Sequence, residues 1–316
     1  MGRLLRIQDK DTIYFLTNRC LEERFFLRPS PEVNELILGW LARAAAIHKV
    51  KLLFFIFMSN HFHLGAQAPK ENIERFMGHF QSALARNLNT LLGRSGPIFA
   101  RRYSAEPILD DASLLQKMIY TLNNPVRAGL VECIEDWPGI SSFSAHMSGA
   151  PITARWLNRE ELRRIRRRRN STTEMEEEAY EFYEMELMCL PAFAAKSHEE
   201  WSSNLRELVA AGAESEAKTR KRKKVLGPAK VLKQDCHRRP SNPDFSERPL
   251  CHTTCASQRE EYRKMVADVT HQYRVAMKRW REGKTEMRFP RGTIPPGWKR
   301  CVQKSDLVVD KYEDFG

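Results

Sequence analysis

Two histidines that are separated by one residue are candidates for a chemical role in this chain. His61 and His63 belong to the stretch MSNHFHL, which follows an apolar run. In an extended strand, alternate side chains point to the same face, so the two imidazoles would lie about 7 Å apart with Phe62 and Leu64 turned towards a core. Two imidazoles on one face could form half of a divalent metal site. The alternative is a pair of partly buried histidines that only make hydrogen bonds.

Tyr120 and Asn124 are a second candidate pair. They lie four residues apart at the end of a helix predicted over 111–123, so they could project side by side. Asn124 could then supply a third, oxygen ligand beside His61 and His63, with Tyr120 in reach of a phosphate held on the metal. A divalent ion polarises a scissile phosphate, and a tyrosine oxygen can attack phosphorus to form a covalent phosphotyrosine. Tyr120 could instead be a core-facing aromatic residue.

The elements that must position these residues follow the order βαββαβ. Strands are predicted over 12–18, 50–58, 61–68 and 98–109, and amphipathic helices over about 32–48 and 71–92. This order predicts an α+β fold, a ferredoxin-like sandwich in which an antiparallel sheet carries helices on one face. Pro107 makes the last strand an edge strand or a late strand end.

Composition indicates an acidic partner. The 316 residues carry a formal net charge of +12, which points to nucleic acid, although a merely soluble basic surface is the alternative. The start of the chain does not resemble a signal peptide, and the longest apolar run, at 50–58, is too short to cross a bilayer. Seven irregularly spaced cysteines favour reduced thiols over a disulfide framework. We expect a cytoplasmic protein with no membrane partner.

Basic residues near the candidate site are predicted to contact phosphates. About half of them should touch DNA, because most surface arginines are only solvated. The candidates are Arg75, Arg86, Arg101, Arg102, Lys117 and Arg127.

Four blocks between about residues 8 and 148 resemble a known family. MSNHFHL resembles the His-hydrophobe-His motif of single-tyrosine HUH transposases, and YTLNNPVRAGLV at 120–131 is similar to a block of the REP-associated tyrosine transposases. GRSGPIFARRYS at 93–104 resembles the family's linker into its fourth strand, and WPGISS at 137–142 resembles the tail that follows. Ile140 departs from the aromatic residue that often precedes the paired serines, which bears on the packing of the tail.

The resemblance implies a role for each candidate. His61 and His63 would be metal ligands, Tyr120 the nucleophile, and Asn124 the helix-borne third ligand. The implied substrate is single-stranded DNA, typically folded into a hairpin and cleaved to a 5′-phosphotyrosine with Mg²⁺ or Mn²⁺. A single tyrosine at the motif position argues against the two-tyrosine relaxases. We expect a monomer, with a dimer as the alternative.

The C-terminal half has a different composition. We divide the chain into a catalytic domain at 1–150 and a basic, mainly helical accessory region at 151–316, with an irregular linker at about 227–256. An arginine-rich stretch at 158–170 precedes an acidic segment at 173–188, for which a helix is predicted, and a further basic cluster covers 218–224. Helices are also predicted at 197–211 and 258–283, the second with a core-facing stripe. We expect this half to help in recognising the DNA target.

A zinc site formed by Cys236, Cys251, Cys255 and a histidine is conceivable, but the spacing fits no common template, so we do not count these residues as ligands.

Two other functions stay open. The leading hypothesis is a metal-dependent single-stranded DNA endonuclease and strand transferase. One alternative is a non-catalytic DNA- or RNA-binding protein on the same sandwich, and another is a metal phosphodiesterase that uses water in place of tyrosine.

Overall fold

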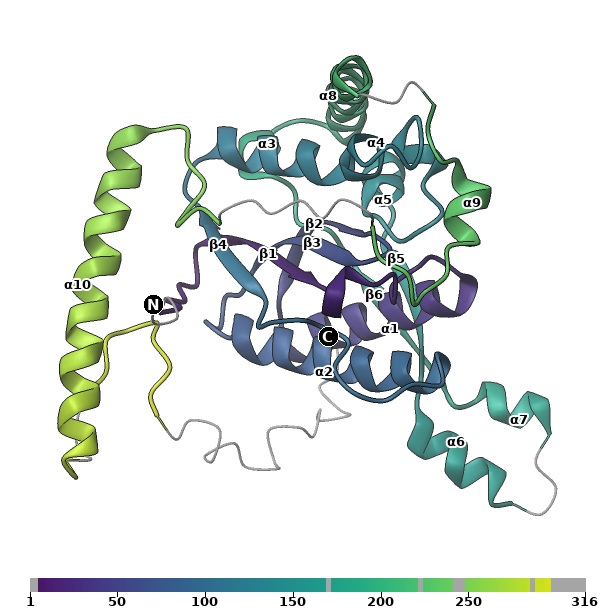
Figure 1. Ribbon diagram of the computed structural model, residues 1–316, viewed down its shortest axis with the longest axis horizontal. Coiled ribbons are helices and arrows are strands. Elements are labelled where there is room, and N and C mark those ends of the chain that lie inside the picture. The colour runs from purple at the N-terminus through teal and green to yellow at the C-terminus, as the bar shows by residue number, and fades with distance from the viewer. Residues whose placement is uncertain (1–4, 169–171, 221–223, 241–247, 285–287, 297–316) are drawn as a thin grey trace.

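A computed structural model describes residues 5–168, 172–220, 224–240, 248–284 and 288–296. Figure 1 shows a central sheet with helices on both sides. In chain order the helices and strands are β1 Ile13–Arg19, η1 Leu21–Glu23, α1 Pro31–His48, β2 Lys51–Phe57, β3 His61–Gln67, α2 Ile73–Leu91, β4 Ser104–Ile108, α3 Asp111–Leu122, α4 Asn124–Arg127, η2 Ile134–Asp136, α5 Phe143–Ser148, β5 Ile152–Leu157, α6 Arg159–Arg166, α7 Thr173–Glu177, β6 Tyr180–Met185, η3 Pro191–Phe193, α8 His198–Thr219, α9 Pro228–Leu232 and α10 Ala256–Arg281.

The main sheet has the predicted ferredoxin-like topology. Its strands are antiparallel in the order β2-β3-β1-β4, with α1 and α2 as the connecting helices. β4 is shorter than the strand predicted over 98–109, and Phe99 contributes only an isolated bridge to Cys20. β4 lies at the edge of the sheet, as expected for a strand that contains Pro107, because proline has no N–H to donate.

Helices cover both faces of this sheet. α1 and α2 pack on one face as predicted, where the core contains Phe57, Phe62, Leu64, Phe76 and Phe80. The other face, for which no cover was predicted, packs against α3, α4, α5 and α8 (Figure 1). Local signals fix the helix starts: the Ser30 side chain caps α1, and the Asp110 carboxylate accepts from the backbone N–H of Ser113 at the start of α3. The chain therefore buries both sides of the strand that carries the histidines.

The helix predicted over 173–188 is wrong. Only α7 is helical there, and β6 pairs with β5 in an antiparallel two-stranded sheet that packs on α1. In β6, Met185 is buried and Tyr183 packs against the core, whereas Phe182 and Glu184, on either side of Tyr183, are exposed. This alternation is the two-residue period of a strand, and pairing with β5 stabilises it over the helical period of the same residues.

The helices predicted near 197–211 and 258–283 are present as α8 and α10. The core stripe predicted for α10 is largely wrong: Val266 is its only buried member and Trp280 is 36% exposed. The residues predicted to form it were Tyr262, Val266, Val269, Tyr273, Met277 and Trp280. α8 packs on α3, α4 and α5. Part of the basic cluster at 218–224 and the end of the stretch at 158–170 lie outside the described residues. The domain division near residue 150 stays a prediction.

Among the described residues, none of the helices combines the length and the apolar character that crossing a membrane requires.

Candidate active site at the end of helix α3

The two histidines of β3 point to the α3 face of the sheet. Their ring centroids lie 5.0 Å apart and their planes are nearly perpendicular, while Phe62 between them is fully buried in the core on the other face. His63 is only 8% exposed and stacks on the ring of Phe15 from the neighbouring strand β1, with centroids 5.2 Å apart. The strand period thus places both imidazoles together, as the sequence predicted.

Asn124 joins the two imidazoles. α3 ends at Leu122, and the buried Asn124 begins the short helix α4, so its side chain reaches the sheet. The Nδ2 atom of Asn124 lies 3.1 Å from Nε2 of His63, and the Asn124 side chain also influences the pKa of His61. The amide oxygen and nitrogen exchange places by a half-turn of the side chain, so an oxygen can face the same point.

A neighbouring residue sets the tautomer of His61. The Oδ1 atom of Asn60 lies 2.7 Å from Nδ1 of His61, and this oxygen can only accept, so Nδ1–H donates. Nε2 of His61 then keeps its lone pair, as a metal ligand requires. The Nδ1 atom of His63 is buried and has no hydrogen-bond partner among the described residues.

Electrostatics keep both imidazoles neutral. Burial lowers the pKa of His61 to about 4, the charges of Arg19 and Arg127 act in the same direction, and the oxygen of the Asn124 side chain opposes them. Burial also lowers the pKa of His63 well below its usual value, assisted by His61, Lys117, Arg19 and Arg127. Neutral imidazoles are the form that binds metal ions, and the surrounding cations favour an anionic ligand such as a phosphate.

Tyr120 lies against this pair from α3. Its ring meets that of His63 edge-on with centroids 5.7 Å apart. The Nζ atom of Lys117 lies 5.1 Å, and the guanidinium carbon of Arg127 4.9 Å, from the centre of the Tyr120 ring. The four residues predicted to form the site are therefore neighbours, and two of the predicted phosphate contacts flank the tyrosine.

The other predicted DNA contacts do not converge here. Arg101 and Arg102 are exposed just before β4, at the edge of the sheet. Arg75 and Arg86 belong to α2, which covers the face of the sheet opposite to the histidines (Figure 1). Their role in DNA binding stays a prediction.

Sequence reasoning missed several neighbours of the site. Arg19 is paired with His61 in the sheet register, and the alternation of β1 could have shown that Phe15 shares the histidine face. His252 hydrogen bonds Glu106 at 2.8 Å and meets the ring of Phe15 edge-on at 5.5 Å. No sequence signal links His252 to Glu106, because 146 residues separate them.

The donor set fits a divalent ion with mixed nitrogen and oxygen ligands. His61, His63 and Asn124 offer two imidazole nitrogens and an amide oxygen, a combination that suits Mn²⁺ better than Mg²⁺, which prefers oxygen alone. Within the described residues no group of three His, Cys, Asp or Glu side chains could hold a metal ion, and this includes Cys236, Cys251 and Cys255. The candidate metal centre at His61 and His63 thus depends on the asparagine.

Comparisons with known proteins give distant similarities. No protein-family model and no curated protein matches the chain. The chain is similar to a solved REP-associated tyrosine transposase bound to a REP hairpin, with 16% identity and a TM-score of 0.41 over 47% of this chain and 86% of that one. It is also similar to a protein from Deinococcus radiodurans R1 described as a "putative transposase", with 19% identity and a TM-score of 0.28 over 38% of this chain and 94% of that one. These similarities are too distant to assign a family or a function.

Proposed function

We propose that this protein is a metal-dependent endonuclease and strand transferase that cleaves single-stranded DNA beside a hairpin. The observation that carries the proposal is the convergence of His61, His63 and Asn124 beside the ring of Tyr120. The net charge of +12 and the cations around Tyr120 fit a polyanionic substrate.

His61, His63 and Asn124 would hold the ion, Mn²⁺ or Mg²⁺. When bound, the ion withdraws charge from the scissile phosphate and so makes phosphorus more electrophilic. Asn60 orients His61 for this role through the hydrogen bond at Nδ1.

Tyr120 would be the nucleophile. Its oxygen loses a proton to solvent and forms a bond to phosphorus, the bond from phosphorus to the 3′ oxygen breaks, and that oxygen takes up a proton as a 3′ hydroxyl. The products are a 5′-phosphotyrosine and a free 3′ end. Lys117 and Arg127, both beside the Tyr120 ring, would stabilise negative charge on the tyrosine oxygen and on the phosphate. The phosphotyrosine bond conserves the ester linkage, so attack by another 3′ hydroxyl reverses the step and joins strands.

The test is formation of a covalent adduct. Labelled hairpin oligonucleotides with single-stranded tails are incubated with the protein and Mn²⁺, and the products are separated on a denaturing gel. We expect a protein-linked labelled band that needs the metal and that falls by at least about a thousandfold in Tyr120→Phe. Tyr180→Phe, on β6, is the matched control and should retain the band.

Each other outcome contradicts the proposal in a different way. An adduct that persists in Tyr120→Phe would assign the nucleophile to another residue. Cleavage without an adduct would favour a phosphodiesterase that uses water. Tight binding with neither cleavage nor adduct would favour a non-catalytic nucleic-acid-binding protein.

A further inference from the structure

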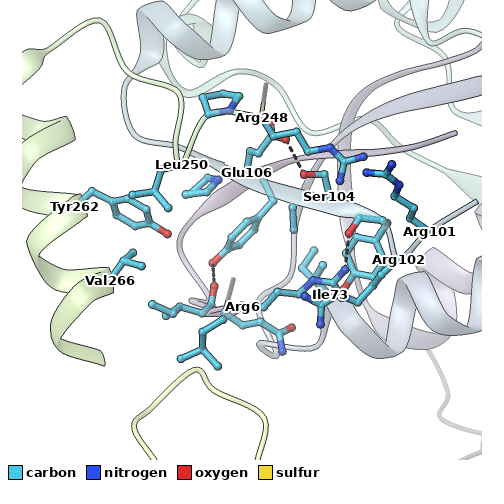
Figure 2. A pocket seen from close by; sticks show the side chains of 18 of the residues that line it. Arg6, Ile73, Arg101, Arg102, Ser104, Glu106, Arg248, Leu250, Tyr262 and Val266 are labelled. Atoms are coloured by element: carbon cyan, nitrogen blue, oxygen red, sulfur yellow. Dashed lines mark hydrogen bonds between the residues drawn. The ribbon is translucent and has the colours of Figure 1, made fainter. Parts of the chain in front are cut away.

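A pocket of about 430 Å³ lies at the edge of the sheet, outside the candidate active site. It is bounded by β4, the N-terminal residues 5–8, residues 248–250 and the first half of α10 (Figure 2). Its volume lies within the range of about 300–1,000 Å³ that is usual for ligand sites.

One side of this edge pocket is cationic. Arg6, Arg101 and Arg102 line it together, as Figure 2 shows, and Arg248 joins them from the segment before α10. Within the part of the chain that the structure describes, no carboxylate forms an ion pair with Arg6, Arg101 or Arg248. Burial lowers the pKa of Arg6 to about 10, Arg102 and Arg248 act in the same direction, and Tyr103 and Glu74 oppose them. Cations gathered in this way attract an anion such as a phosphate.

Arg6 is already held in position. Its guanidinium carbon lies 3.6 Å from the centre of the Tyr103 ring, and the same group donates a hydrogen bond to the carbonyl oxygen of Tyr103. A cation that is fixed by a ring and a backbone carbonyl needs little ordering when a ligand binds.

The opposite side of the pocket is aromatic and apolar. Tyr262 and Val266 of α10 and the neighbouring Leu250 lie across from Arg101 and Arg102 (Figure 2). A ring next to apolar side chains is a surface on which an unstacked base packs in single-strand binding proteins.

One acidic residue, Glu106, lines the pocket but its two carboxylate oxygens are occupied. Oε1 accepts from the Ser104 hydroxyl at 2.6 Å, and Oε2 lies 2.8 Å from Nε2 of His252. His252 in turn contacts the Phe15 ring, which stacks on His63. The contacts of Glu106, His252 and Phe15 thus link the edge pocket to the candidate active site.

We infer that the edge pocket binds one nucleotide of a single-stranded tail, with its phosphate on the arginines and its base against Tyr262. The base must leave its stack to enter, so the ligand is a single strand and not a duplex. This inference rests on the proposed function for its choice of DNA, and it adds a second contact that would fix the position of the tail relative to Tyr120.

The experiment measures binding without chemistry. Fluorescent hairpins with single-stranded tails are titrated with Tyr120→Phe protein in EDTA, and the tail nucleotides are replaced one at a time by abasic sites. We expect one tail position at which loss of the base weakens binding about tenfold. Tyr262→Ala should weaken binding of the intact tail by a similar factor and remove the effect of the abasic site.

Three variants make the result specific. Tyr262→Phe keeps the ring and should keep the affinity, which separates base packing from a folding defect. Arg263→Ala removes a charge from a 73% exposed side chain next to Tyr262 and should leave the abasic profile unchanged. Arg101→Ala should reduce both the affinity and its salt dependence.

Several results would overturn the inference. One is a Tyr262→Ala protein that binds like Arg263→Ala, and another is an abasic profile that is flat along both tails. The inference would also be contradicted if Tyr262→Ala weakened binding only of free thymidine monophosphate, or only of an RNA tail of the same sequence. A negative binding result would not affect adduct formation at Tyr120. Absence of the adduct in wild-type protein would not affect the binding result, so the two proposals can be disproved separately.

Discussion

The two faces of strand β3 differ in every property that matters for function. Phe62 and Leu64 are completely buried under α1 and α2, among apolar side chains. On the reverse side, His61 and His63 are desolvated next to the cations Arg19, Lys117 and Arg127. The apolar face gains stability from burial, whereas the histidine face buries groups that prefer water. Polar burial that opposes stability is typical of functional sites, so this comparison favours the histidine face as the place of the proposed chemistry.

The largest expected effect tests the apolar face. Phe62→Ala removes a fully buried ring and should lower the free energy of unfolding by about 3–5 kcal/mol, measured by denaturant titration. Phe182→Ala, at a ring that is 67% exposed, is the matched control and should change it by less than about 0.5 kcal/mol. His61→Ala should cost less than Phe62→Ala, since the His61 ring is partly exposed. Equal costs for these two would mean that both faces serve stability alike.

The next effect concerns acid sensitivity on the histidine face. Burial lowers the pKa of His146 in α5 to about 4, against the hydrogen bond between its Nε2 and the carbonyl oxygen of Leu53. The unfolded chain therefore binds this proton at higher pH than the folded protein, so the contribution of neutral His146 is complete above pH 6.5 and is lost as the pH falls towards 4. The stability difference between wild type and His146→Gln should shrink by about 2–3 kcal/mol between pH 7.5 and 4.5. A difference that is constant with pH would show that His146 is not desolvated.

Metal binding should distinguish two histidine pairs. Mn²⁺ at about 100 times its dissociation constant should stabilise the wild-type protein by about 2.7 kcal/mol, seen as a rise in melting temperature, and His61→Ala should abolish the rise. His48 and His79, whose ring nitrogens lie 3.2 Å apart between α1 and α2, form the control pair, so His48→Ala should keep the response. Loss of the response in His48→Ala but not in His61→Ala would place the metal on the other side of the molecule.

The site was predictable where local rules determine it. The two-residue period of a strand places His61 and His63 together, and helix geometry with the break before Pro125 places Tyr120 and Asn124 on one side of the chain. α3 packs on the sheet because its apolar side chains Leu114, Met118 and Leu122 belong to the hydrophobic core on that face.

Long-range pairing was not predictable from these rules. Residues 173–188 satisfy a helical period, and only the presence of β5 more than twenty residues earlier converts Tyr180–Met185 into a strand. The backbone of His252 pairs with the edge of β4, where its N–H donates to the carbonyl of Pro107, and composition around His252 gives no hint of this. Both cases depend on a distant partner, which a window of neighbouring residues does not contain.

The smallest effect tests on which face the DNA lies. Arg127, beside the Tyr120 ring, and Arg86, on α2, carry the same charge but occupy opposite sides of the sheet. Each phosphate contact on a single strand contributes about 0.7 to the slope of the logarithm of affinity against the logarithm of salt concentration. Arg127→Ala should therefore reduce that slope by about 0.7, whereas Arg86→Ala should leave it unchanged, measured by anisotropy titrations over a range of NaCl concentrations in Tyr120→Phe protein. If instead Arg86→Ala reduces the slope and Arg127→Ala does not, the DNA strand binds across α2 and not on the histidine face.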